Sequence, residues 1–195
     1  MNLSDISHIR TGLVTARKKA SVIDKKTFLY KSITLKSFNR NGQVSLENFD
    51  EFISKEEIKS DYLTKKNDIL VRLREPNIAI YIDRDNTDLL ISSLVAIIRV
   101  DITKVSSKFL TYYLNSTIVK KASKAHITGT AISMIKTKEL ENLEIKLPSL
   151  EEQKKIVEFL DLTNKEIDLL RSLKNQKEKY YRDVFNNILK NGAIK

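Results

Sequence analysis

Cysteine and tryptophan are absent from this sequence of 195 residues, which also has only four glycines and two prolines. The lack of cysteine excludes disulfide bonds and cysteine-ligated metals, and it is compatible with a reducing cytoplasm, where we expect the protein to act. The N-terminus has no apolar signal core, and the most apolar stretch, residues 89–100, is too short to span a membrane. No membrane partner is therefore expected.

Recognisable catalytic motifs are also lacking. The two histidines, His8 and His126, are far apart and have no metal-ligand spacing around them. The sequence contains no nucleophile elbow, no phosphate-binding glycine loop, and no methyltransferase-type or nuclease-type motif. The acids Asp83 and Asp85 in IDRDNTD fit a solvated turn better than a metal loop. We predict no catalytic residue, no metal and no cofactor, and hence a protein that is not an enzyme.

What the chain has in excess is positive charge, with a net charge of +10. From Ser149 onward there are ten Lys and Arg against eight Asp and Glu, so residues 1–148 carry a net charge of +8. This balance suits nucleic acid or another anionic surface, because neutralising phosphates supplies most non-specific affinity. A lysine-rich proteome from an AT-rich genome would give the same composition, so charge alone leaves the partner open.

The pattern of apolar residues predicts an α+β domain over residues 1–148, followed by one long helix over 149–195. Strand-like segments rich in β-branched and aromatic residues are 28–35, 69–73, 78–82, 89–100 and 140–147. Helical periodicity covers 106–114 and 116–125, and 46–60 is helix-compatible in places. Asn41-Gly42 is typical of a hairpin or tight turn.

The long helix is marked by its boundaries. Ser149 is a good N-cap, Glu152 completes a capping box, and Asn191-Gly192 ends the pattern. About 40 residues at about 1.5 Å each would reach about 60 Å. Its heptad-like apolar positions, interrupted at Lys174 and Lys177, are predicted to form a dimerisation seam: Ile156, Leu160, Ile167, Leu170, Leu173, Tyr181, Val184 and Ile188. Either the helix lies across its own domain, or it forms a coiled coil with a second copy or another protein.

Four polar, basic loops stand between the apolar elements, at 15–21, 36–43, 72–77 and 124–133. Their side chains are of the types that contact phosphates and base edges in a duplex, and Arg72 and Arg74 could bind guanine with two hydrogen bonds. The predicted DNA contacts are Arg17, Lys18, Lys19, Asn39, Arg40, Arg72, Arg74, Asn77, Lys124, Thr128, Thr130 and Ser133. An alternative for each arginine is a solvated or ion-paired surface residue.

The C-terminal third carries a resemblance. Gly129-Thr130-Ala131 is followed by LENLEIKLP at 140–148 and LEEQKKIV at 150–157, which leads into the helix. With LSDI and Gly12 near the start, and residues 63–70 around Asp68, the chain resembles one half of a specificity subunit of type I restriction-modification systems. The resemblance spans nearly the whole sequence.

The resemblance implies a function. In this family a full subunit has two target recognition domains separated by two long antiparallel helices, each domain reads one part of a bipartite DNA site, and methyltransferase and restriction subunits join the scaffold. One domain and one helix imply a half-subunit that homodimerises through its helix and reads an interrupted palindrome. A truncated gene or a separated half with another partner would give the same sequence. The alternative from another class is a coiled-coil scaffold whose basic domain binds protein or an anionic surface.

Overall fold

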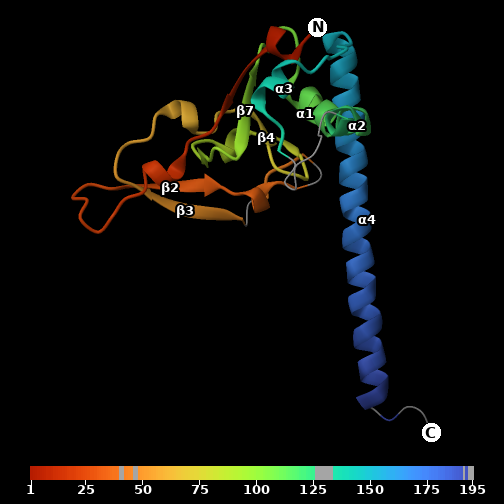
Figure 1. Cartoon of the computed structure of the whole chain (residues 1–195). Helices are drawn as coiled ribbons and strands as arrows, with labels where there is room; N and C mark the ends of the chain where they lie inside the picture. The colour runs from red at the N-terminus through yellow and green to blue at the C-terminus, as the bar shows by residue number, and fades with distance from the viewer. Residues whose placement is uncertain (40–41, 46–47, 126–133, 191, 193–195) are drawn as a thin grey trace. The chain divides into compact units, whose positions relative to one another are not determined.

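The computed structural model describes the chain except residues 40–41, 46–47, 126–133, 191 and 193–195, and it describes only the backbone of 122–125 (Figure 1). The chain divides into a strand-rich domain, Met1–Lys154, and a helical part, Lys155–Lys195. The division falls inside the long helix α4 (Leu150–Lys190), whose first turn packs within the strand-rich domain. No helix among the described residues is long and apolar enough to cross a membrane.

The described strands of the domain form two sheets. The four-stranded sheet is antiparallel throughout, in the order β1 (Ser7–Thr11), β7 (Val95–Val100), β4 (Ile69–Arg72) and β5 (Ala79–Tyr81). The three-stranded sheet has the order β3 (Phe49–Ser54), β2 (Phe28–Ile33) and β6 (Leu90–Ile91). In this sheet β2 is antiparallel to β3 and parallel to β6.

Both sheets contribute to one apolar core. Leu70, Ile80 and Ile97, from the four-stranded sheet, cluster with Ile33 and Ile91 from the other sheet, and each is at most 1% exposed. The strands β4 and β7 are buried on both faces over residues 69–71 and 95–98, which explains why these stretches are continuous apolar runs rather than alternating ones. The core therefore fixes the positions at which the surface loops leave the sheets.

Three short helices follow the strands in sequence: α1 (Ser107–Asn115), α2 (Thr117–Ala125) and α3 (Thr137–Glu141). Ser106 caps α1 by accepting a hydrogen bond from the backbone N–H of Phe109, and Phe109, Leu110 and Leu114 form its buried face. The 3₁₀ turns of the domain are Leu3–Asp5, Thr15–Arg17, Leu35–Ser37, Ser60–Tyr62 and Arg84–Asn86. The predicted helices at 106–114 and 116–125 are confirmed.

Gly12 allows the chain to pass directly against the turn between β6 and β7. A Cβ at this position would lie 2.3 Å from the carbonyl oxygen of Ser92, closer than atoms can approach. The next residue, Leu13, donates its N–H to the Ile91 carbonyl at 2.7 Å. The glycine is therefore required by close backbone packing.

Three expectations from the sequence were wrong. Residues 140–147 do not form a strand, because Thr137–Glu141 is helix α3 and only a bridge between Asn2 and Glu144 is paired in the manner of a sheet. The helix-compatible segment 46–60 contains strand β3, since pairing with β2 outweighs its acidic composition. The single strand expected at 89–100 is divided into β6 and β7, which belong to different sheets.

The long helix begins as predicted. The backbone N–H and hydroxyl of Ser149 donate to the Glu152 carboxylate at 2.9 and 2.8 Å, and the Glu152 N–H donates to the Ser149 hydroxyl at 3.3 Å. One residue further, Gln153 is completely buried. Its Oε1 accepts from the Ser106 N–H at 2.8 Å, and its Nε2 donates to the carbonyls of Lys104 at 3.3 Å and Pro148 at 3.0 Å. This side chain fastens the helix start to the domain.

Candidate nucleic-acid interface

The fold separates the predicted contact loops into two groups at opposite ends of β2. Residues 15–27 with 53–57, named the tip region here, lie at the Phe28 end, because Phe28 pairs with Ser54 and Lys19 bridges to the same Ser54. Residues 35–39 with 72–77, named the proline region, lie at the Ile33 end. Five residue steps along β2 separate these ends by about 17 Å. Those predicted contacts that the structure describes therefore do not form one continuous cluster.

In the tip region, three predicted basic residues are placed differently. Lys18 pairs with Glu56, which lowers the pKa of the Glu56 carboxyl below its ordinary value. Arg17 and Lys19 are exposed. Two of the three predicted cations are therefore open to a ligand from solvent, and the third is held in an ion pair.

Positive charge is concentrated around this region. Residues 15–36 contain seven Lys or Arg against one acid, Asp24. Six of the seven are exposed, namely Arg17, Lys19, Lys25, Lys26, Lys31 and Lys36. Along β3 the acids Asp50 and Glu51 lie opposite Ser32 and Lys31 and offset the charge of the sheet. Five of the seven cations belong to the tip region, which also contains the acids Asp24, Glu56 and Glu57.

In the proline region, most of the predicted side chains hold the backbone in place. The Arg72 guanidinium donates to the carbonyls of Glu75 at 3.0 Å and Leu35 at 3.5 Å. Asn77 Nδ2 donates to the carbonyls of Arg72 at 3.1 Å and Leu73 at 3.0 Å. Asn39 Oδ1 accepts from the Gln43 N–H at 2.9 Å. Arg72 and Asn77 thus order the turn at 72–77, and Asn39 orders its own turn. Arg74, Glu75 and Pro76 are exposed, and Arg74 is the cation among them.

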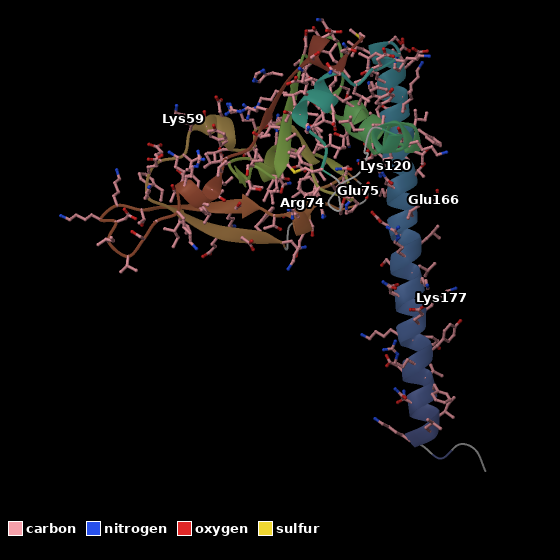
Figure 2. All side chains as sticks on the ribbon, in the orientation of Figure 1. Lys59, Arg74, Glu75, Lys120, Glu166 and Lys177 are labelled. Carbon is pink, nitrogen blue, oxygen red and sulfur yellow. The ribbon has the colours of Figure 1, made fainter. Side chains whose placement is uncertain are left out.

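A mainly apolar cavity of about 150 Å³ lies beside this turn. Glu75 and Lys120 lie at it together, with Pro76, Leu114 and Ile135 among its other lining residues (Figure 2). The backbone bridge between Arg74 and Met134 brings the residues after position 133 to the same place. Glu75 and Lys120 therefore place opposite charges at an apolar hollow, and Arg74 precedes Glu75 in the same turn.

Several predicted contacts cannot be placed. Arg40, Thr128, Thr130 and Ser133 lie outside the described residues. Lys124 lies in α2, where only the backbone of its turn is described. For metals, the described residues hold no group of three or more His, Cys, Asp or Glu side chains placed to bind an ion.

The predicted dimerisation residues all lie on α4, where six of the eight are at least 38% exposed. The seam is wider than predicted. At about 100° per residue, apolar side chains cover about 200° of the helix surface, more than the narrow stripe of a two-helix coiled coil. The additional members, which the heptad pattern does not include, are Phe159, Leu162, Leu169, Tyr180, Phe185 and Leu189, all exposed.

Comparison with known proteins identifies the family. The model of the type I restriction modification DNA specificity domain matches residues 1–179. The type I restriction enzyme MjaVIII specificity subunit of Methanocaldococcus jannaschii is 37% identical over 86 residues, which cover 44% of this chain and 20% of that protein.

Solved structures show the same fold. The HsdS subunit from Thermoanaerobacter tengcongensis matches with a TM-score of 0.67 and 16% identity over 92% of this chain and 45% of its own. The type I restriction-modification S subunit from M. genitalium matches with a TM-score of 0.56 and 18% identity, over 92% of this chain and 42% of its own. A chain from a study of complex assembly and conformational transition of the type I R-M system matches with a TM-score of 0.64 and 19% identity. The match covers 94% of this chain and 42% of that one. The chain thus spans less than half the length of these relatives.

Proposed function

Since the chain belongs to the type I restriction modification DNA specificity family, we propose that its strand-rich domain recognises one part of a bipartite duplex DNA site. The observation that supports this most directly is the exposed positive charge of the tip region. Arg17, Lys19, Lys25 and Lys26 are exposed within ten residues that contain one acid. Phosphate contacts from such side chains position a protein on a duplex, and base contacts then specify the sequence.

We assign separate roles to the two regions. The cations of the tip region contact phosphates, and their arrangement sets the register on the duplex. Arg74 of the proline region contacts a base, because its guanidinium is exposed while Arg72 and Asn77 hold its turn. The ordered turn limits the conformations open to Arg74, which reduces the entropic cost of binding.

We further propose that the protein is a half-subunit that homodimerises through α4 and scaffolds methyltransferase subunits, with restriction subunits joining them. The apolar surface of about 200° on α4 is wide enough for two neighbours, such as a second copy of the helix and a methyltransferase subunit. Two copies would present two recognition domains, so the DNA site would be a two-fold symmetric pair of half-sites.

Methylome sequencing of cells that express this chain with a cognate modification subunit tests the proposal. A single methylated motif, symmetric and interrupted by unspecified bases, is the expected result. An asymmetric motif would show that the chain pairs with a different half. If the two proteins form a stable complex and no motif is methylated, recognition by this chain as proposed is wrong.

A binding measurement addresses the tip region separately. Removing one phosphate-binding cation should reduce the slope of log affinity against log salt by about 0.9. The double variant Arg17→Ala, Lys19→Ala should therefore reduce the slope by up to about 2 for duplexes of any sequence. Lys138→Ala, which removes an exposed cation from α3, is the control. An unchanged slope in the double variant would contradict phosphate binding at the tip.

A further inference from the structure

The adjacent pair Val22 and Ile23 has the most exposed large apolar side chains among the described residues. Val22 is fully exposed and Ile23 is 89% exposed. Both lie in the loop that precedes β2 and projects from the domain (Figure 1). Transfer of a Val or Ile side chain out of water is favourable by about 1.5 to 3 kcal/mol, so leaving two of them exposed side by side is unfavourable without a binding role.

The pair is held in a defined turn. The backbone N–H and hydroxyl of Ser21 donate to Asp24 Oδ2 at 2.6 and 2.9 Å, and the Asp24 N–H donates to the Ser21 carbonyl at 3.2 Å. These bonds lower the pKa of the Asp24 carboxyl below its ordinary value. Val22 and Ile23 occupy the two central positions, where turns normally carry Gly, Pro, Asn, Asp or Ser. The turn is thus ordered before any ligand arrives.

The turn also stands away from the sheet beneath it. An open hollow of about 670 Å³ is lined by Val22, Lys19, Phe52 and Ile53, among others. The apolar pair therefore does not complete the core of its own domain. It is available to another molecule.

The charges around the pair indicate the chemistry of that molecule. Lys19, Lys25 and Lys26 are exposed on both sides of the turn in sequence. The nearest acid in sequence, Asp24, is used within the turn, and Lys55 acts on its carboxylate. Glu51 also lines the hollow, and it lies opposite Lys31 of β2. An apolar centre with cations around it matches a polyanion that carries apolar groups between its charged strands. A DNA duplex has this arrangement in its major groove, where thymine methyl groups lie between two lines of phosphates.

We propose that Val22 and Ile23 read thymine by contact with its 5-methyl group in the major groove, while the surrounding lysines contact phosphates. This inference rests on the proposed DNA recognition and adds two specificity-determining residues to it. The major groove, about 12 Å wide, admits a two-stranded ribbon and hence also a projecting turn of four residues. Because the turn is ordered in advance, its position relative to the bases is defined.

The test uses the full-length chain with its modification subunit and a duplex that carries the motif selected by the wild-type complex. Each thymine of the motif is replaced in turn by uracil, which removes only the methyl group. Removal of one buried methyl group should weaken wild-type binding about fourfold. The variant Val22→Ala, Ile23→Ala should bind the parent duplex about tenfold less tightly and show no further loss with uracil.

A matched control is Ile102→Ala, an isoleucine 64% exposed elsewhere in the domain. It should retain wild-type affinity and the uracil effect. If the double variant keeps both the selected motif and the uracil effect, the apolar pair does not read DNA, although the proposed function stands. If the double variant instead loses the same affinity for duplexes of every sequence, the pair does not read thymine.

A third outcome would also refute the inference. If vesicles containing phosphatidylserine bind wild type and not the double variant, while the DNA measurements are the same for both proteins, the pair contacts lipid. If the wild-type complex selects no motif from a random duplex library, the proposed function itself fails, and the two failures are distinguished.

Discussion

Gln153 offers a sharp test of what holds the first turn of α4 within the strand-rich domain. It is completely buried and makes three hydrogen bonds, one of them to the N–H of Ser106, the N-cap residue of α1. Gln153→Ala removes all three and leaves a partly buried N–H and two carbonyls without these partners. Each hydrogen bond contributes about 1 kcal/mol, and a group that stays out of water without a partner costs more. The free energy of unfolding should therefore fall by about 2 to 4 kcal/mol.

The expected loss does not come from helix propensity, since Ala is the better helix former. The control is Gln176→Ala, which changes an exposed glutamine of the same helix and should alter stability by less than about 0.5 kcal/mol. Gln153→Glu is a second variant of the same shape. Its carboxylate can accept from Ser106 and cannot donate to the carbonyls of Lys104 and Pro148, so its destabilisation should decrease as pH falls and the carboxyl is protonated.

Urea unfolding followed by circular dichroism, at one protein concentration for all variants, measures these differences. Hydrogen exchange at the Ser106 amide gives the local readout, because this N–H loses its acceptor in Gln153→Ala. If Gln153→Ala and Gln176→Ala have the same unfolding midpoint and the Ser106 amide stays protected, the side chain does not fasten the helix to the domain.

Three further predictions concern other parts of the molecule. The double variant Leu160→Glu, Ile167→Glu should convert a dimer to a monomer in sedimentation equilibrium, and an unchanged mass would contradict dimerisation through α4. Arg74→Ala should alter the selected DNA motif with little change in urea midpoint, whereas Arg72→Ala should lower the midpoint as well, because its guanidinium holds two backbone carbonyls; unchanged motifs in both variants would contradict this assignment. The pKa of Asp24 is lowered in the folded state, so its turn should persist above the ordinary value of 3.8 and open as pH falls through the lower folded-state value. The NMR shift of the amide at the start of that turn reports the opening, and a midpoint at or above 3.8 would contradict it.

Local signals in the sequence predicted the elements that depend on neighbouring residues. The capping box of Ser149 and Glu152 and the uninterrupted pattern after it were sufficient for α4. Strand pairing was harder to predict, because β3 is acidic and its stability comes from β2. The segment 140–147 was misassigned because alternating apolar residues there contact the N-terminus through single hydrogen bonds rather than a ladder.

In the candidate interface, too, residue types could be predicted from the sequence, whereas their contacts could not. Basic loops are visible in a sequence, and so is an apolar pair such as Val22-Ile23, although its exposure is not. That Arg72 bonds to the carbonyl of Leu35, 37 residues away, depends on the register of two sheets. The sequence predicted the same role for Arg72 and Arg74, since both lie in one turn, and it did not show that only Arg74 is exposed.

The family, the long helix and the excess of positive charge could be inferred from the order of the residues alone, because these features depend on local sequence and composition. Which polar groups are already held in hydrogen bonds within the domain became known only from the packing of the fold. In the sequence, Gln153 is one residue of the segment LEEQKKIV, and the structure places its side chain against Ser106, Lys104 and Pro148. Hydrogen-bond partners far apart in sequence are chosen by the packing of the whole domain, which no short segment encodes.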